Sequence, residues 1–132
     1  YVFLHVVSDQ RHFKDVLLKE KDAQGRKLEV IKMVMPKPIY ISLEESTGVK
    51  LNQGTLVREE NLRLAASYIN FYICNEAIIM PGFGDDNDIV AKDIVAKAFP
   101  QHQVHQIYAK EILLGGGNIH CITQQIPEGV KI

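Results

Sequence analysis

The segment SYINFYICNEAIIMPGFG, residues 67–84, limits the possible folds more than any other part of the chain. Apolar side chains stand at every second position of its first half, at Ile69, Phe71 and Ile73. This period of two predicts a β-strand with one buried face. Asn75 and Glu76 can form a tight turn, and the apolar run from Ala77 to Met80 predicts a buried return strand. The segment therefore predicts a β-hairpin.

A helix and a third strand are expected directly after the hairpin. Apolar residues recur there at helical spacing, at Val90, Ala91, Ile94, Val95 and Ala98. The run GDDND before them, residues 84–88, offers side chains that can cap a helix. The run does not fit a calcium loop, because it lacks alternating ligands and a downstream glutamate at the right spacing. Phe99 and Pro100 end the helix and HQVHQIYA at 102–109 predicts a strand, so residues 67–109 predict one ββαβ unit.

The first half of the chain shows weaker patterns. Residues 1–7 are an apolar stretch, and residues 9–21 predict a short amphipathic helix. The apolar face of that helix is formed by Phe13, Val16, Leu17 and Leu18. Residues 22–25 predict a turn, and the Val- and Ile-rich segment after them predicts a strand that ends at Pro36, because proline removes a ladder donor. Residues 43–62 are polar and are expected to form a long loop.

The composition fits a single domain that has no strong charge for binding nucleic acid or an anionic membrane. A length of 132 residues, 46% of them hydrophobic, is enough for one core. A formal net charge of -1 attracts neither nucleic acid nor an anionic membrane, so neither is expected as a partner. No apolar run reaches the ~20 residues that span a bilayer, and the first residues lack the pattern of a signal peptide. Because the chain begins at Tyr1, we expect a fragment or a processed product.

The cysteine and histidine positions favour neither a disulfide scaffold nor a metal site. Cys74 and Cys121 are the two cysteines of the sequence, so a reducing, cytoplasmic compartment is expected. Their spacing from the histidines fits no structural zinc site. His102 and His105 lie three apart in an expected strand and would point to opposite faces. They are interpreted as ordinary polar residues, and no metal is expected.

The stretch LLGGGNIHCITQQIP, residues 113–127, leaves two interpretations of its cysteine open. In the first, Cys121 is a small buried hydrophobe in a core strand between Ile119 and Ile122. In the second, it is a nucleophile on a shaped loop, which requires a thiolate stabilised by amides or by a cation. The bare backbone of residues 115–117 could supply such amides and admit a substrate. The glycine run lacks the spacing of a phosphate-binding loop.

The partner of such a nucleophile is expected from another part of the fold. His120 is adjacent to Cys121, but neighbouring residues in a strand point apart. Asn70 lies on the polar face of its expected strand. We expect its side chain to face solvent or to bond to the backbone rather than to line a pocket.

The motif EILLGGGNIHCITQQIP resembles the closing motif of agmatine deiminases, in the wider family that includes bacterial-type peptidylarginine deiminases. Two earlier segments, GRKLEVIKMVMPKPIYI and LRLAASYINFYICNEAIIMPGFGDDND, resemble preceding parts of the same family. The similarity therefore extends from about Gly25 to Pro127. A glycine triplet, Asn-Ile-His-Cys and Thr-Gln-Gln together form a specific pattern. The chain is similar to the C-terminal portion of such an enzyme, with residues 1–132 as a single domain fragment.

The resemblance implies a fold class and a set of site residues. The implied fold is α+β, a partial pentein α/β-propeller built from ββαβ-type units, with a clear blade at about residues 67–109. It implies a catalytic loop at residues 114–123, with Cys121 as the nucleophile. The implied active-site loop residues are Gly115, Gly116, Gly117 and Asn118.

The implied reaction is hydrolysis of the agmatine guanidinium, a step of putrescine and polyamine biosynthesis. Cys121 would attack the guanidinium carbon and ammonia would leave, giving a covalent amidino-cysteine. Water would then release N-carbamoylputrescine. A thiolate attacks more readily than a thiol, and the cationic substrate itself stabilises that thiolate. The chemistry requires no cofactor or metal.

One part of the family pattern is missing from the chain. Paired carboxylates bind a guanidinium and a histidine usually protonates the leaving group. The resemblance implies that these groups come largely from earlier blades, including a His-x-Asp motif. None of the 5 histidines here has an aspartate two residues later. Activity is therefore expected to need upstream residues, from a longer gene product or from a complementing N-terminal portion.

Three alternatives stay open at the level of sequence. A partial propeller leaves strand edges uncovered, which favours association, including a homo-oligomer. Without its upstream partners the chain could be an inactive remnant or an interaction domain. The substrate could also be free or peptidyl arginine, whose carboxylate or backbone would need a clamp such as Arg58 or Arg63.

Overall fold

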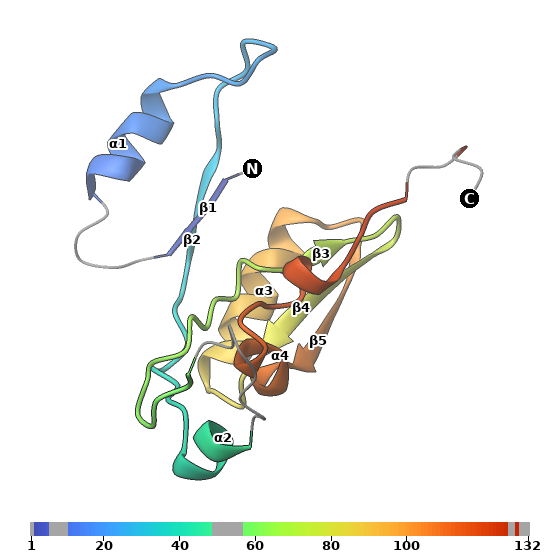
Figure 1. Ribbon diagram of the computed structural model, residues 1–132. Coiled ribbons are helices and arrows are strands. Elements are labelled where there is room, and N and C mark those ends of the chain that lie inside the picture. Colours follow the sequence, from blue (N-terminus) through green and yellow to red (C-terminus); the bar gives the residue numbers. More distant parts are fainter. Residues whose placement is uncertain (1, 6–10, 49–56, 127–128, 130–132) are drawn as a thin grey trace.

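The computed structural model describes residues 2–5, 11–48, 57–126 and 129. In chain order, its elements are β1 (Val2–His5), α1 (Arg11–Lys19), β2 (Val30–Met33), α2 (Leu43–Thr47), β3 (Tyr72–Ile73), β4 (Ala77–Gly82), α3 (Asn87–Ala98), β5 (Gln103–Tyr108), α4 (Lys110–Leu114) and a 3₁₀ helix, η1 (His120–Ile122). The expected start of the first helix at Asp9 lies outside the described residues. Figure 1 shows α1, β1 and β2 beside a larger body that holds β3, β4, β5, α3 and α4.

The larger body contains the predicted ββαβ unit. β3 pairs antiparallel with β4, and β4 pairs parallel with β5, so the strand order is β3-β4-β5. The connection from β4 to β5 is α3, because a parallel pair needs a crossover. The N–H of Cys74 donates to the carbonyl of Ala77 at 2.8 Å across the turn at Asn75 and Glu76. The hairpin, the helix and the mixed α/β character of the fold are confirmed.

The alternation expected before the turn is only partly present. Tyr68, which alternates with the apolar positions Ile69 and Phe71 and so belongs to the opposite face of an ideal strand, is fully buried, and Ile73 is exposed. The reason is that regular pairing is confined to Tyr72 and Ile73, so the residues before them follow an irregular path. β4 is longer than the expected end at Met80 and continues through Pro81 to Gly82.

The hydrophobic core lies between the sheet and the helices on its two sides. Figure 1 shows α3 behind the sheet and α4 in front of it. Buried apolar residues from these elements, from β2 and from the connecting segments form one cluster: Met33, Ala66, Tyr68, Phe71, Ile78, Met80, Phe83, Ala91, Val95, Ala109, Leu113 and Ile119. The predicted helical stripe contributes Ala91, Val95 and Ala98, whereas Val90 is 44% exposed. Burial of these side chains is the main force that holds the unit together.

The N-terminal elements reach this core through Met33 of β2 and Phe3 of β1. β1 and β2 pair in parallel, and α1 lies between them in the chain. The ring centroid of Phe3 in β1 lies 5.3 Å from that of Phe71 and 6.0 Å from that of Phe99. The predicted strand before Pro36 is confirmed and ends at Met33. The apolar face expected for α1 is largely uncovered by the described residues, since Phe13 is 63% exposed.

The expected loop at 43–62 contains a helix, which is a correction. α2 begins after Ser42, whose hydroxyl accepts the N–H of Glu45 while the Glu45 carboxylate accepts the N–H of Ser42, a capping box. Glu45 also pairs with Lys110 at 2.7 Å, which ties α2 to the first residue of α4. Lys110 and the Ser42 N–H hold the pKa of the Glu45 carboxyl at about 2. Residues 49–56 of that expected loop lie outside the described residues.

The described helices are all short. Over the ranges that the structure describes, none is long and apolar enough to cross a membrane.

Candidate active site

The segment after α4 presents Cys121 on a turn of 3₁₀ helix rather than in a strand. η1 spans His120–Ile122, so the core strand considered for this cysteine is absent. Ile119 is buried, but Cys121 and Ile122 are both exposed. The structure therefore leaves the thiol accessible and does not use it as a core hydrophobe.

The three glycines shape the turn instead of donating to the sulfur as a group. The N–H of Gly115 donates to Ile112 and that of Gly116 to Leu113, each at 2.9 Å, so both close the end of α4. Gly116 has a φ of +89°, a conformation that residues with a Cβ rarely adopt. A Cβ on Gly117 would lie 3.0 Å from the Cβ of Cys121. A side chain at 117 would therefore crowd Cys121 and require it to shift.

The donors that face the sulfur come from two asparagines. The backbone N–H of Asn118, followed by the side chain of Asn70, holds the pKa of the Cys121 thiol below its ordinary value. Asn70 Nδ2 donates to Cys121 Sγ at 3.3 Å. The expectation of amide donors is met by Asn118 rather than by the glycine triplet. Hydrogen bonds to the charged form are a known cause of a lowered pKa.

Asn118 is buried and holds this turn together through hydrogen bonds. Its side chain is only 3% exposed, and its Oδ1 accepts the N–H of Ile119 at 2.8 Å. Its carbonyl accepts the N–H of Ile122 at 3.3 Å. The Nδ2 of Asn118 is buried and has no hydrogen-bond partner among the described residues.

The thiol opens into a cavity of about 300 Å³. The residues that line it are Arg63, Leu64, Ala65, Asn70, Leu113, Gly116, Gly117, Asn118 and Cys121. Sequence reasoning placed Asn70 at a backbone contact or in solvent; it makes the backbone contact and lines this cavity as well. Arg63 is the arginine that reaches the cavity, and Arg58 is not among its described lining residues. The described lining holds no carboxylate, the group that a bound guanidinium requires.

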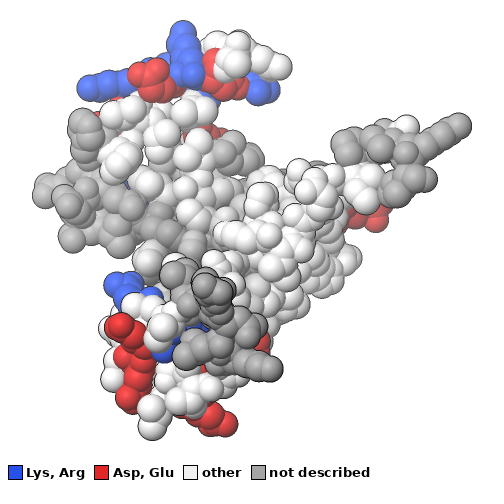
Figure 2. Space-filling model, viewed as in Figure 1, with Lys and Arg blue, Asp and Glu red and all other residues white. Residues whose placement is uncertain are grey.

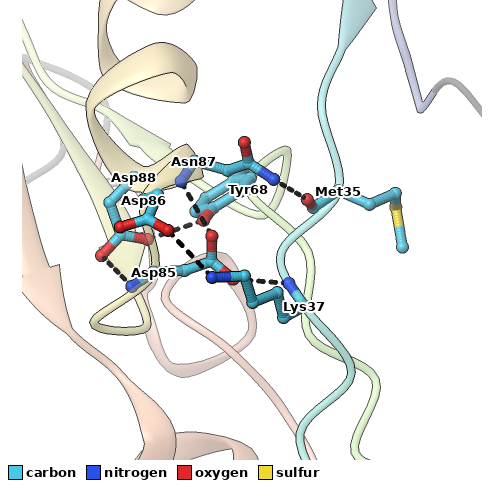
Figure 3. Close-up of polar contacts among 7 residues, drawn as sticks. All are labelled: Met35, Lys37, Tyr68, Asp85, Asp86, Asn87 and Asp88. Atoms are coloured by element: carbon cyan, nitrogen blue, oxygen red, sulfur yellow. Dashed lines mark hydrogen bonds and ion pairs between the residues drawn. The ribbon is translucent and has the colours of Figure 1, made fainter.

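Asn70 lies in the irregular segment before β3 and not in a strand as expected, and Tyr68 of that segment is anchored by the acidic run at the start of α3 (Figure 3). The Tyr68 hydroxyl donates to Asp88 Oδ1 at 2.6 Å. Asp88 also accepts the N–H groups of Phe83, Gly84 and Asp85, at 3.0, 2.9 and 3.3 Å. Burial and the neighbouring Asp88 raise the pKa of Tyr68 above its ordinary value, so the phenol stays a donor.

The other residues of the acidic run hold the helix start and the segment before α2. Asp85 accepts the N–H of Asn87 at 2.8 Å and that of Lys37 at 2.7 Å. Asp86 makes no capping hydrogen bond and pairs instead with Lys37 Nζ at 2.9 Å. Of the GDDND run, Asp85 therefore caps the first N–H of α3, whereas Asp88 accepts from the loop before the helix and Asp86 makes no cap bond. Among the described residues, no group of three or more His, Cys, Asp or Glu side chains could hold a metal ion.

Comparison with known proteins identifies close relatives of this chain. Residues 6–127 match the family described as Porphyromonas-type peptidyl-arginine deiminase. A Listeria monocytogenes protein named "Putative agmatine deiminase 1" is 56% identical over 115 residues, which cover 87% of this chain and 32% of that protein. The agmatine deiminase of Pseudomonas aeruginosa is 51% identical over 112 residues, covering 85% of this chain and 30% of that protein.

A solved structure matches the fold closely. The chain superimposes on the agmatine deiminase of Enterococcus faecalis with a TM-score of 0.85 at 35% identity, covering 97% of this chain and 37% of that one. The chain thus spans about a third of the length of the curated relatives it matches. The resemblance expected from the sequence is confirmed by these matches. The chain belongs to the Porphyromonas-type peptidyl-arginine deiminase family.

Proposed function

We propose that this chain is the nucleophile-bearing part of an agmatine deiminase. The observation that carries the proposal is the Cys121 thiol, which opens into a cavity while two amide donors face its sulfur. The relatives named as agmatine deiminases, at 51% to 56% identity, supply the substrate class. The thiolate is the form of cysteine that attacks an electrophilic carbon, and a lowered pKa and an accessible sulfur both favour that attack.

The proposed reaction passes through a covalent intermediate on Cys121. The thiolate forms a bond to the guanidinium carbon, and the C–N bond to one terminal nitrogen breaks after that nitrogen gains a proton, releasing ammonia. Water then adds to the same carbon, and the C–S bond breaks to regenerate the thiolate. The product is N-carbamoylputrescine, which feeds putrescine and polyamine biosynthesis. Two steps of this kind replace one slow direct hydrolysis.

The remaining groups are proposed to come from sequence beyond these residues. The described cavity lining has no carboxylate to bind the guanidinium, and the sequence has no His-x-Asp motif to protonate the departing nitrogen. We place the ββαβ unit as a blade of a pentein propeller, and residues 114–123 as its catalytic loop. Figure 2 shows that the middle of the visible face carries almost no Lys, Arg, Asp or Glu, which suits packing against further blades. The two free cysteines suit the cytoplasm.

The proposal predicts that the natural full-length protein converts agmatine into N-carbamoylputrescine and ammonia in equal amounts. Ammonia is measured by a coupled assay and the ureido product by mass spectrometry. Release of neither product would contradict the proposal. A catalytically inactive interaction domain would give that result.

A second substrate, arginine, is favoured by one observation. Arg63 lines the same cavity as Cys121. A guanidinium at that position would attract the carboxylate of free arginine or the carbonyls of a peptide, and would repel the ammonium of agmatine. We expect agmatine to be used in preference to arginine in a competition assay. If arginine is preferred, and the preference falls about tenfold or more in Arg63→Gln, the arginine deiminase assignment replaces the first.

Gly117→Ala is expected to lower kcat/KM for agmatine by about tenfold or more. The added Cβ meets the Cβ of Cys121 at 3.0 Å, so the nucleophile must move, and small displacements of reacting groups are costly. Gly116→Ala is the matched comparison, because its Cβ meets nothing within 4 Å and strains only the backbone. That variant should lose stability, by about 1 kcal/mol, and retain most of its activity. Equal activity of the Gly117→Ala variant and the wild type would contradict the crowding explanation.

A further inference from the structure

Asn70 lies between the backbone of the cysteine turn and the sulfur. Its Oδ1 accepts the N–H of His120 at 2.8 Å, and its Nδ2 donates to Cys121 Sγ at 3.3 Å. Its main-chain carbonyl also accepts the His120 N–H, at 3.3 Å. One side chain therefore contacts both the backbone that carries the nucleophile and the nucleophilic atom.

The orientation of this carboxamide is fixed by its backbone partner. A backbone N–H can only donate, so the oxygen end of Asn70 must face His120. The NH₂ end is then turned toward the sulfur. A thiol proton could instead donate to Oδ1, but that separation is 3.8 Å, longer than the 3.3 Å from Nδ2 to Sγ. The geometry therefore suits the thiolate better than the thiol.

Asn70 is itself held on a fixed piece of backbone. Tyr68, two residues earlier, is fully buried and bonded to Asp88. Phe71, the next residue, is buried against the rings of Phe3 and Phe99. A donor mounted between two buried anchors is preorganised, and it loses little entropy when it stabilises a charge.

Among the described residues, few other charged side chains lie near the Cys121 sulfur. Arg63 lines the cavity beside Cys121, and its charge acts in the same direction as the amide donors. His120 precedes Cys121 and is exposed, outside the described cavity lining. The remaining donors are the backbone N–H groups of Asn118 and of Cys121 itself. Asn70 is therefore the side chain in this group that donates to the sulfur, and its replacement tests that donor directly.

We propose that Asn70 is a positioning residue that anchors the cysteine turn through His120 and presents an N–H donor to Sγ, so that neutral amides prepare the thiolate before substrate binds. The inference deepens the proposed deiminase function and rests on Cys121 being its nucleophile. It assigns the preparation of the nucleophile to this chain, whatever residues elsewhere protonate the leaving group.

The test compares two replacements of nearly equal size in the natural full-length protein. Asn70→Asp keeps an oxygen for the His120 N–H but turns a carboxylate oxygen toward the sulfur. Asn70→Leu removes both contacts. Cys121 is alkylated with iodoacetamide across a pH series without substrate, and its peptide is quantified by mass spectrometry. Asn75→Asp, at the exposed hairpin turn, introduces the same charge away from the cavity and serves as the control.

The wild-type midpoint of alkylation is expected below that of free cysteine. Asn70→Asp should raise the midpoint by about one pH unit or more, because a donor is replaced by a negative charge. Asn75→Asp should leave it unchanged. If Asn70 only shapes the turn, Asn70→Asp will keep the wild-type midpoint while Asn70→Leu changes it, and the inference is overturned. Asn70→Ser removes the carboxamide donor without adding a charge, so it should raise the midpoint by a smaller amount and serves as the test should the aspartate variant not fold.

Failure of this inference and failure of the proposed function give different results. A raised midpoint in a protein that releases no ammonia from agmatine supports the role of Asn70 and rejects the deiminase assignment. Ammonia release together with an unchanged midpoint supports the assignment and overturns the role of Asn70. The alkylation series is independent of substrate, so the two results are read separately.

Discussion

Cys121→Ala in the natural full-length protein is expected to reduce ammonia release from agmatine by at least about 10³-fold. Removing a nucleophile leaves only the rate that binding and electrostatic stabilisation can supply. The chain offers a matched control in Cys74, which is half-buried at the end of β3 and is not among the described lining residues of the Cys121 cavity. Cys74→Ala should keep activity within about twofold, since core-edge substitutions of this size have small effects.

The same pair of variants identifies the covalent intermediate. Wild-type protein and Cys74→Ala should each carry an amidino adduct on the peptide that contains Cys121 after rapid acid quenching with agmatine present. Undiminished turnover in Cys121→Ala would remove this residue from the mechanism. It would also remove the cavity as the catalytic site, because the described lining contains no other nucleophilic side chain.

Asp88→Ala is expected to lower the free energy of unfolding by about 3 kcal/mol. Its carboxylate accepts from the hydroxyl of buried Tyr68 and from three backbone N–H groups before α3. Each buried donor left without an acceptor costs about 1–3 kcal/mol, and partial access of water lowers the sum. Urea unfolding of the full-length protein, followed by circular dichroism, measures the change. Tyr68→Phe, which removes one of these bonds, should cost about 1 kcal/mol.

Asp86→Ala is the control for charge and position. Asp86 is in the same acidic run, but its side chain is 94% exposed and pairs only with Lys37 at the surface. Exposed ion pairs contribute little, so the free energy of unfolding should change by less than about 0.5 kcal/mol. Equal effects of the Asp88 and Asp86 replacements would show that net charge, and not the hydrogen-bond hub at Asp88, sets the stability.

The parts of the fold that the sequence predicted depend on local signals. The hairpin, α3 and β5 follow from a turn at Asn75, an apolar stripe and a short apolar strand, each contained within about a dozen residues. The helix α2 was missed although its signal was present, because Ser42 and Glu45 have the spacing of a capping box. Polar composition alone was an insufficient reason to expect a loop there.

The candidate site was predictable only in part, because its contacts are long-range. The motif identified Cys121, but Asn70 precedes it by 51 positions and no periodicity connects the two. The strand period places Tyr68 on the face opposite the apolar side chains. Its hydroxyl instead reaches Asp88, 20 positions later, and the bond makes burial of the ring possible. Sequence patterns report which face is apolar, and they do not report which polar groups meet inside.

The aromatic contact of Phe3 imposes an order on events during synthesis. Within these residues β1 is made before the two rings that Phe3 packs against, which belong to Phe71 and Phe99. Chains are made at about 5–20 residues per second, so β1 waits several seconds before its native neighbours exist. During that time the ring is available to whatever apolar surface is nearby. The later-made ββαβ unit thus supplies the native packing partners of the earlier-made strand β1.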